Sequence, residues 1–150
     1  MLLDAYRKAL IGLPVSHVWR GYGSALFVEF GELHSQKKQD GTMANPIGDI
    51  TLMIEWSWRI EKTRSILGGS WSNQKRWSGM FKKLIGAYVI DVQLIGHIPE
   101  IEISLSNDLR IVSFMTSEGQ PAWALICHTI HPGTLSVCRG KLSEKYERLS

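Results

Sequence analysis

The stretch from Asp49 to Glu61 constrains the fold more than any other part of the sequence. Every second position in it is hydrophobic, namely Ile50, Leu52, Ile54, Trp56, Trp58 and Ile60. Strict alternation is the period of a β-strand with one face in a core and the other nearer water. Fully extended, the stretch would span roughly 40 Å, about twice a typical strand. We therefore expect it to bend or bulge and to contribute to two sheet surfaces.

The residues before this stretch predict a helix, a hairpin and a loop. Residues 1–11 carry apolar side chains at three- and four-residue intervals, and Gly12 and Pro14 then end the predicted helix. Two short alternating runs, 15–19 and 25–31, flank a glycine-containing turn and predict a β-hairpin. The polar segment 34–48 is rich in turn-forming residues and predicts an exposed loop.

The second part of the chain echoes the first. The segments K-A-L-I-G-L-P-V-S-H-V (8–18) and K-K-L-I-G-A-Y-V-I-D-V (82–92) share Leu, Ile, Gly, Val and Val at a constant offset of 74. Trp123 is a plausible counterpart of Trp58, and a second helix is expected after Ser72, which we predict to be its N-cap. The echo predicts two pseudo-repeated helix-plus-hairpin halves, about residues 1–71 and 72–128, that complete one core together.

We therefore predict one domain over residues 1–150, of the α+β class and mainly antiparallel β. The expected core resembles a barrel, roll or sandwich of six to eight strands, with the helices over its open ends. The C-terminal tail, 129–150, is expected to add a short strand at 135–138 and then a polar helical turn with Leu142, Tyr146 and Leu149 on one stripe.

Composition bounds the function classes. The hydrophobic fraction of 44% and charged fraction of 21% are ordinary for a globular protein, and no apolar run approaches the roughly 18 residues of a membrane span. The first residues show no pattern of a secretory signal, so a cytoplasmic location is expected. A net charge of +3 is mildly basic, which permits nucleic-acid binding without indicating it.

One cluster has the residue types of a metal site: Cys127, His128, His131 and Cys138. Zinc takes two Cys and two His, but adjacent strand residues such as Cys127 and His128 point to opposite faces. We therefore predict no metal and no cofactor, and two free thiols.

The polar face of the long strand suggests a second kind of site. It carries Glu55, Arg59 and Glu61, and Glu100 and Glu102 lie on a predicted strand of the other half. Paired carboxylates can act as acid and base if burial raises the pKa of one of them. A solvated sheet face with cross-strand Arg–Glu pairs accounts for the same residues, and we favour it. A small-ligand or hydrolytic β-barrel using Glu55 and Arg59, with His17 or His97, is the alternative.

Six tryptophans are many for this length. We expect Trp56, Trp58 and Trp123 in the core. Trp71 and Trp77 flank Arg76, and Trp77 shares one stripe of the predicted helix with Phe81 and Leu84. A solvated helix face accounts for the polar residues around them, and exposed anchors for a protein partner are the alternative, because aromatic and Arg residues dominate binding hot spots. The same mixture of residues with Lys75, Lys82 and Lys83 makes weak binding of single-stranded nucleic acid a further alternative.

The segments W-R-I-E (58–61), I-L-G-G-S-W-S (66–72) and L-I-G-x-x-V-x-x-V (84–92) resemble small bacterial proteins of an uncharacterised β-rich family. The likeness covers most of residues 10–126 and implies a second half similar to the first. It implies no activity and no functional residues. Related small β-rich proteins encoded near contact-dependent toxins add an immunity-type binder to the hypotheses.

The leading hypothesis is a non-enzymatic bacterial protein that binds an unknown protein partner, through Trp71, Arg76 and Trp77 or through the loop 34–48. The approximate twofold relation of the halves also predicts a homodimer. Membrane association is not expected.

Overall fold

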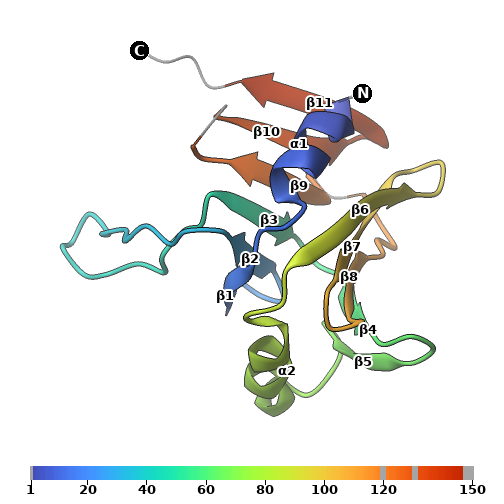
Figure 1. Cartoon of the computed structure of the whole chain (residues 1–150), viewed down its shortest axis with the longest axis horizontal. Coiled ribbons are helices and arrows are strands. Elements are labelled where there is room, and N and C mark those ends of the chain that lie inside the picture. The colour runs from blue at the N-terminus through green and yellow to red at the C-terminus, as the bar shows by residue number, and fades with distance from the viewer. Residues whose placement is uncertain (1, 119–120, 130–131, 147–150) are drawn as a thin grey trace.

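The computed structural model describes residues 2–118, 121–129 and 132–146, which form mainly antiparallel β-structure with two short α-helices (Figure 1). The elements follow one another in the order α1 (Leu2–Leu10), β1 (Val15–Arg20), β2 (Leu26–Phe30), β3 (Ile50–Ile54), β4 (Trp58–Glu61), β5 (Ile66–Gly69), η1 (Gln74–Arg76), α2 (Trp77–Leu84), β6 (Val89–Ile95), β7 (Glu100–Leu105), β8 (Arg110–Ser113), β9 (Trp123–Cys127), β10 (Gly133–Cys138) and β11 (Lys141–Tyr146).

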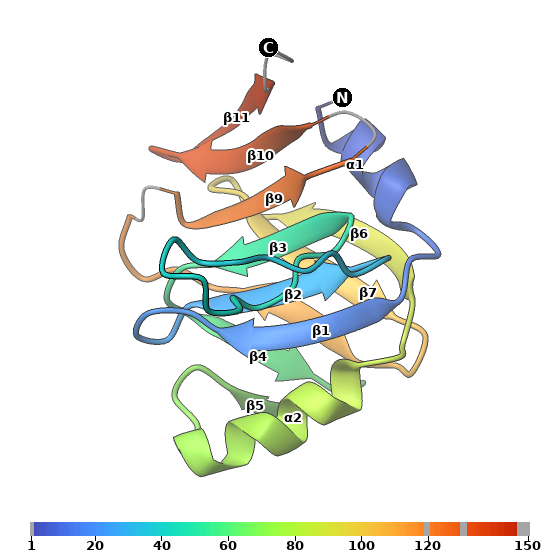
Figure 2. The same cartoon turned by 90° about the vertical axis from the view of Figure 1, so that its left-hand side faces the viewer.

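The strands form two sheets. The six-stranded sheet has the order β1-β2-β3-β9-β10-β11, and the five-stranded sheet has the order β5-β4-β8-β7-β6 (Figure 2). Neighbouring strands in both sheets are antiparallel, which confirms the predicted mainly antiparallel fold. In the described part of the chain neither sheet closes into a barrel, so the barrel form of the prediction is wrong.

The long alternating stretch contributes to both sheets, as its length predicts. Its first part is β3 of the six-stranded sheet, its second part is β4 of the five-stranded sheet, and residues 55–57 form the bend between them. The chain crosses back beside it, because β9 pairs with β3 and β8 pairs with β4. Trp56 lies on the bend, where the alternation breaks, and 44% of it is exposed, so its predicted core position is wrong.

Side chains from both sheets and both helices meet in one hydrophobic cluster. Trp58 and Trp123 are fully buried in it, as predicted. Each indole N–H has a backbone acceptor, because Trp58 donates to Ser24 O at 2.7 Å and Trp123 to Pro99 O at 2.9 Å. Removing a buried ring of this size costs about 3–5 kcal/mol, so these two side chains are central to the stability of the fold.

The two linkers that lead from each helix to the next strand pair with each other and join the sheets at β1 and β6. Their four backbone hydrogen bonds are Gly12 N to Val89 O, Gly86 N to Val15 O, Val15 N to Ala87 O and Val89 N to Leu13 O, at 2.7–2.9 Å. Gly12 and Gly86 have φ angles of 91° and 94°. Both lie in the left-handed region that favours glycine, so each linker depends on its glycine.

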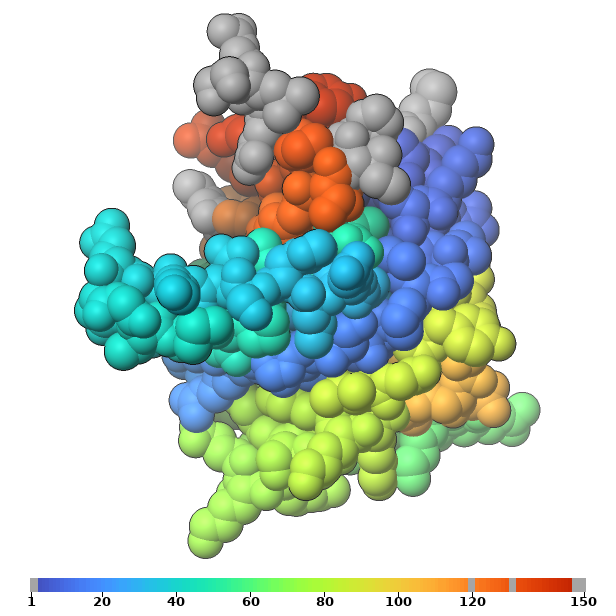
Figure 3. Space-filling model, turned by 60° about the vertical axis from the view of Figure 1, so that its left-hand side comes forward, coloured from blue at the N-terminus to red at the C-terminus, as the bar shows by residue number. Residues whose placement is uncertain are grey.

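The loop before β3 and the tail differ in how well the sequence predicts them. Residues 34–46 are largely exposed and protrude from one side of the molecule, teal in Figure 3, which confirms the predicted loop. In the tail, the strand predicted at 135–138 lies within β10, but residues 141–146 form β11 and not a helical turn. Arg139 and Gly140 both have positive φ and make the tight turn that pairs β11 with β10.

We expect Gly12→Ala and Gly86→Ala each to lower the free energy of unfolding by about 1–2 kcal/mol, because alanine is strained at positive φ. A β-carbon at either position would contact nothing within 4 Å, so backbone strain alone carries the effect. Urea denaturation measures it. Gly79→Ala, within α2 and equally free of close neighbours, is the control and should stabilise the protein slightly. If neither Gly12→Ala nor Gly86→Ala changes the free energy of unfolding, the linkers do not depend on their glycines.

Candidate functional site

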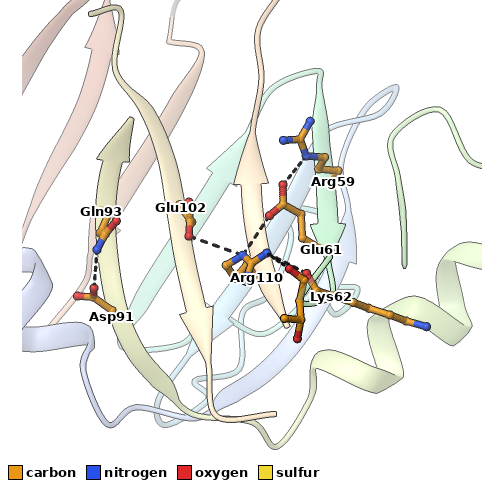
Figure 4. Close-up of polar contacts among 8 residues, drawn as sticks. Arg59, Glu61, Lys62, Asp91, Gln93, Glu102 and Arg110 are labelled. Atoms are coloured by element: carbon orange, nitrogen blue, oxygen red, sulfur yellow. Dashed lines mark hydrogen bonds and ion pairs between the residues drawn. The ribbon is translucent and has the colours of Figure 1, made fainter. Parts of the chain in front are cut away.

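The outer face of the five-stranded sheet carries a ladder of charged side chains across β4, β8 and β7 (Figure 4). Glu61 is its centre. One carboxylate oxygen accepts from Arg59 Nε at 2.7 Å and the other from Arg110 Nε at 3.0 Å. Arg110 Nε also lies 3.7 Å from a carboxylate oxygen of Glu102. The Arg110–Glu61 and Arg110–Glu102 pairs are the cross-strand Arg–Glu pairs predicted for a solvated face, whereas Arg59 and Glu61 lie two residues apart on the same strand.

The ladder keeps Glu61 ionised. Partial burial raises the pKa of the Glu61 carboxyl, but hydrogen bonds and charges from Arg59 and Arg110 outweigh it and leave the pKa below its ordinary value of 4.5. A general acid at neutral pH needs a raised pKa. The ladder therefore has the character of a fixed ion-pair network.

A hollow beside the ladder exposes the most accessible of the tryptophans. This hollow, here called the Trp71 hollow, encloses about 400 Å³ and is lined by Trp58, Arg59, Ile66, Gly69, Ser70, Trp71, Ser72 and Phe114. Trp71 is 88% exposed and Ile66 is 62% exposed. The guanidinium carbon of Arg59 lies 5.4 Å from the centre of the Phe114 ring, a cation–π contact.

A second hollow adjoins the first and is cationic. This Arg64 hollow encloses about 310 Å³ and is lined by Arg59, Glu61, Lys62, Arg64, Ser65, Ile66 and Arg110. Arg59 and Ile66 line both hollows, so the two form one continuous surface along β4 and β5. Aromatic, aliphatic and cationic groups therefore lie next to one another there.

Close packing of β5 positions Trp71. A β-carbon on Gly69 would lie 2.5 Å from the backbone oxygen of Trp58, so this position requires glycine, and one on Gly68 would lie 2.1 Å from Met80 Sδ and would displace that side chain. The turn after β5 is held by Ser70 N, which donates to Trp58 O at 2.9 Å, and by Gly69 N, which donates to Ser72 Oγ at 3.0 Å. The turn therefore fixes where the Trp71 backbone lies.

Ser72 is thus not the helix cap that the sequence predicts. Asn73 takes that role, because its Oδ1 accepts from Lys75 N at 3.0 Å at the start of η1. α2 then continues directly from η1.

The structure separates the other predicted anchors. Trp77 is only 4% exposed, and its ring lies 5.2 Å from that of Trp58 in an edge-to-face arrangement. Its predicted exposure is wrong, because the apolar stripe of α2 turns it into the core. Arg76 is exposed on η1 but lines neither hollow. Trp71 and Arg59, which the sequence assigns to different hypotheses, lie together in the Trp71 hollow.

The residues of the predicted ligand or hydrolytic site do not converge. Glu55 lies in the bend between β3 and β4, whereas Arg59 is bonded to Glu61 on β4. His17 Nε2 lies 2.9 Å from Asn45 Oδ1, and His97 lies in the turn after β6. None of the contacts found in the described residues links Glu55 with Arg59 or with either histidine.

The predicted metal-like cluster is described only in part, because His131 lies outside the described residues. Cys127 and Cys138 are free, partly buried thiols. His128 Nε2 lies 2.9 Å from the Thr51 hydroxyl oxygen. Within the described ranges, no three His, Cys, Asp or Glu side chains are placed to share a metal ion. The same part of the chain has no helix of the length and apolarity that crossing a bilayer requires.

A buried carboxylate network, which sequence reasoning missed, lies under the base of the loop. Glu29 on β2 is fully buried, and its carboxylate accepts from Trp19 Nε1 at 2.8 Å, from Gly48 N at 3.1 Å and from the Thr51 hydroxyl. Strand alternation places Glu29 on the outer face of its sheet, and nothing in the sequence indicates that the loop covers it. The Thr51 hydroxyl donates to Glu29, so the network is a clamp that holds the end of the loop on β2 and β3.

A third hollow, of about 340 Å³, lies where β7 begins and where β8 and β10 end, with Glu100, Met115 and Arg139 in its wall. The Glu100 carboxylate already has a structural partner, because it accepts a hydrogen bond from Met115 N at 2.8 Å. Ser117 and Glu118 also line this hollow. It adds no convergent set of reactive groups.

Comparison of the chain with protein-family models, curated proteins and solved structures finds no match. The resemblance to an uncharacterised bacterial family therefore stays a prediction.

We expect Glu29→Ala to lower the free energy of unfolding by about 3 kcal/mol, because the Trp19 indole N–H, Gly48 N–H and Thr51 hydroxyl lose their buried acceptor. Glu29→Gln keeps the shape and one acceptor oxygen and should cost less. Urea denaturation measures both, with Glu32→Ala on the exposed neighbouring loop as the control that changes little. A loss below about 1 kcal/mol for Glu29→Ala would contradict the clamp.

Glu61 predicts a pH dependence. Its pKa is lower in the folded protein than its ordinary 4.5, so its ionisation adds stability above that pH, and the contribution disappears as the pH falls through the folded value. Wild type and Glu61→Gln should therefore differ most near neutral pH and converge in acid. Urea denaturation over a pH series measures the difference. Equal pH profiles for the two proteins would show that the ladder contributes no stability.

Proposed function

We propose that the chain is a non-enzymatic protein-binding domain whose recognition surface consists of the Trp71 hollow and the adjoining Arg64 hollow. One observation carries the proposal: Trp71 presents 88% of its surface to solvent beside a hollow that contains further apolar side chains. Tryptophan and arginine are the residues most enriched at binding hot spots.

The energetics support a partner that covers Trp71. An aromatic side chain gains free energy when its apolar surface leaves water, by about 25 cal/mol per Å². Ile66 and Phe114 extend the apolar surface on which a partner side chain would pack. The bonded turn and the glycine pair hold the backbone on either side of Trp71, so little backbone order would be lost on binding.

The enzymatic alternative has less support in the same geometry. Glu61 is engaged by two arginines, and its pKa is lowered rather than raised. Glu55, Arg59 and the two histidines His17 and His97 do not form a constellation. An immunity-type role, a homodimer and a cytoplasmic location stay proposals, and they rest on the sequence alone.

We also propose that residues 1–71 and 72–128 are two versions of one folding unit. The linker hydrogen bonds support this, because adding or subtracting 74 turns the Gly12–Val89 bond into the Gly86–Val15 bond, and the Val15–Ala87 bond into the Val89–Leu13 bond. The strand order supports it too. Each half supplies three adjacent strands to one sheet, β1-β2-β3 or β6-β7-β8, and then crosses to supply β4 or β9 to the other. This proposal requires that Gly12→Ala and Gly86→Ala lower the free energy of unfolding by similar amounts.

Selection from a random displayed peptide library tests the proposed function. We expect the wild-type protein to enrich peptides whose affinity falls at least tenfold in Trp71→Ala, a loss of about 1.4 kcal/mol that is typical of a hot spot. Tyr146→Ala is the matched control, since Tyr146 is a 71% exposed aromatic residue on β11, at the opposite end of the molecule from β5 (Figure 1). Peptides that bind both variants as they bind the wild type would overturn the proposed surface.

A further inference from the structure

We infer that the Arg64 hollow receives carboxylates from an acidic segment of the partner protein, while the Trp71 hollow receives an apolar side chain of the same segment. This inference rests on the proposed function and names the chemistry of the partner.

The charges that line the Arg64 hollow are unbalanced. Arg59, Lys62, Arg64 and Arg110 supply four cations, and Glu61 is the single carboxylate in the lining. Glu61 is already bonded to Arg59 and Arg110, with one oxygen for each. Lys62 and Arg64 are exposed, and their charged groups make no ion pair with the described residues. The hollow therefore has cationic donors left for an anionic group from outside.

Arg59 is oriented before any partner binds. Its Nε donates to Glu61 at 2.7 Å, and its guanidinium lies over the Phe114 ring. The two terminal amino groups of Arg59 make no hydrogen bond with the described residues. A guanidinium held along one edge keeps donors for a carboxylate and loses little side-chain freedom on binding.

The turn that carries Lys62 and Arg64 is held in place as well. Lys62 N donates to Ser65 O at 2.8 Å across the turn between β4 and β5. Arg110 Nη2 donates to Lys62 O at 2.8 Å and so ties the turn to β8. The Arg110 side chain thus positions the turn, whereas Lys62 and Arg64 present their charges to the hollow.

One partner segment can occupy both hollows, because Arg59 and Ile66 line both of them. A segment that lies along β4 and β5 can place an apolar residue against Trp71 and Ile66 and a neighbouring acidic residue against Arg59 and Arg64. Apolar contact then contributes most of the affinity, and the charges contribute orientation and rate of association.

An acidic protein segment fits this surface better than nucleic acid. Single-stranded nucleic acid uses several aromatic platforms for successive bases along a cationic groove. Here one tryptophan is fully open to stacking, because Trp58 is buried and Phe114 is covered by Arg59.

Two short peptides test the inference: one alternates glutamate and leucine, and the other has glutamine in place of every glutamate. Each is titrated into isotope-labelled full-length protein at low salt, and NMR follows the Arg59 and Arg64 Nε–H signals and the Trp71 indole N–H signal. We expect the acidic peptide to shift all three signals and the glutamine peptide to bind at least tenfold more weakly. A poly-thymidine oligonucleotide is titrated as the third probe.

Two exposed variants make the test specific. Lys62→Gln with Arg64→Gln should weaken binding of the acidic peptide at least tenfold and leave the fold unchanged, because neither side chain is part of an ion pair found in the structure. Lys82→Gln with Lys83→Gln, on α2, is the charge-matched control and should leave the affinity unchanged.

The outcomes separate the inference from the proposed function. Equal binding of both peptides, tighter binding of the oligonucleotide, or no effect of Lys62→Gln with Arg64→Gln would each overturn the inference of an acidic partner. Library peptides that depend on Trp71 but contain no acidic residues would overturn it too and leave the proposed function standing. If acidic peptides bind equally well to the wild type and to Trp71→Ala, the cationic site is supported and the proposed function is overturned.

Discussion

The fold depends on one paired crossing between its two sheets. The chain passes from β3 to β4 and returns from β8 to β9, so that β3 pairs with β9 and β4 with β8. Each crossing carries one fully buried tryptophan, Trp58 at the start of β4 and Trp123 at the start of β9. Because these rings lie where the sheets meet, they fill the space between the layers, and both indole N–H groups find backbone acceptors. The same crossing therefore sets which strands pair within each sheet and supplies the tryptophans that pack between the two sheets.

The crossing also explains where the candidate site lies. Trp58 turns inward at the start of β4, so Arg59 and Glu61 follow on alternate positions of the outer face. The pairing of β4 with β8 then brings Arg110 to Glu61, and the pairing with β5 brings the Trp71 turn to Arg59. A surface with one open tryptophan and several cations is the result of these pairings rather than of any single sequence motif.

Local pattern predicted some of this and failed at particular residues. The alternation of residues 50–61 predicted a strand that bends between two surfaces, and it predicted a solvated face that carries Arg59 and Glu61 and forms cross-strand Arg–Glu pairs. It failed for Trp56, because the bend turns one side chain out of register with its neighbours. The hypothesis that Trp77 is an exposed anchor was based on its position next to Arg76. It is wrong, because Trp77 lies on the apolar stripe of α2 and is buried. Glu29 could not be found from sequence, because the loop that buries it closes over β2 from later in the chain.

The sequence by itself determined the strand periods, the two helices, the glycine-dependent linkers and the balance of charge, because each follows from the steric and solvation preferences of near neighbours in the chain. The tertiary structure alone decided which strands share a sheet, which tryptophans are open to solvent and which carboxylates are paired. These outcomes depend on contacts between segments far apart in sequence, and the free energy of such contacts is set by burial and geometry that no local window contains.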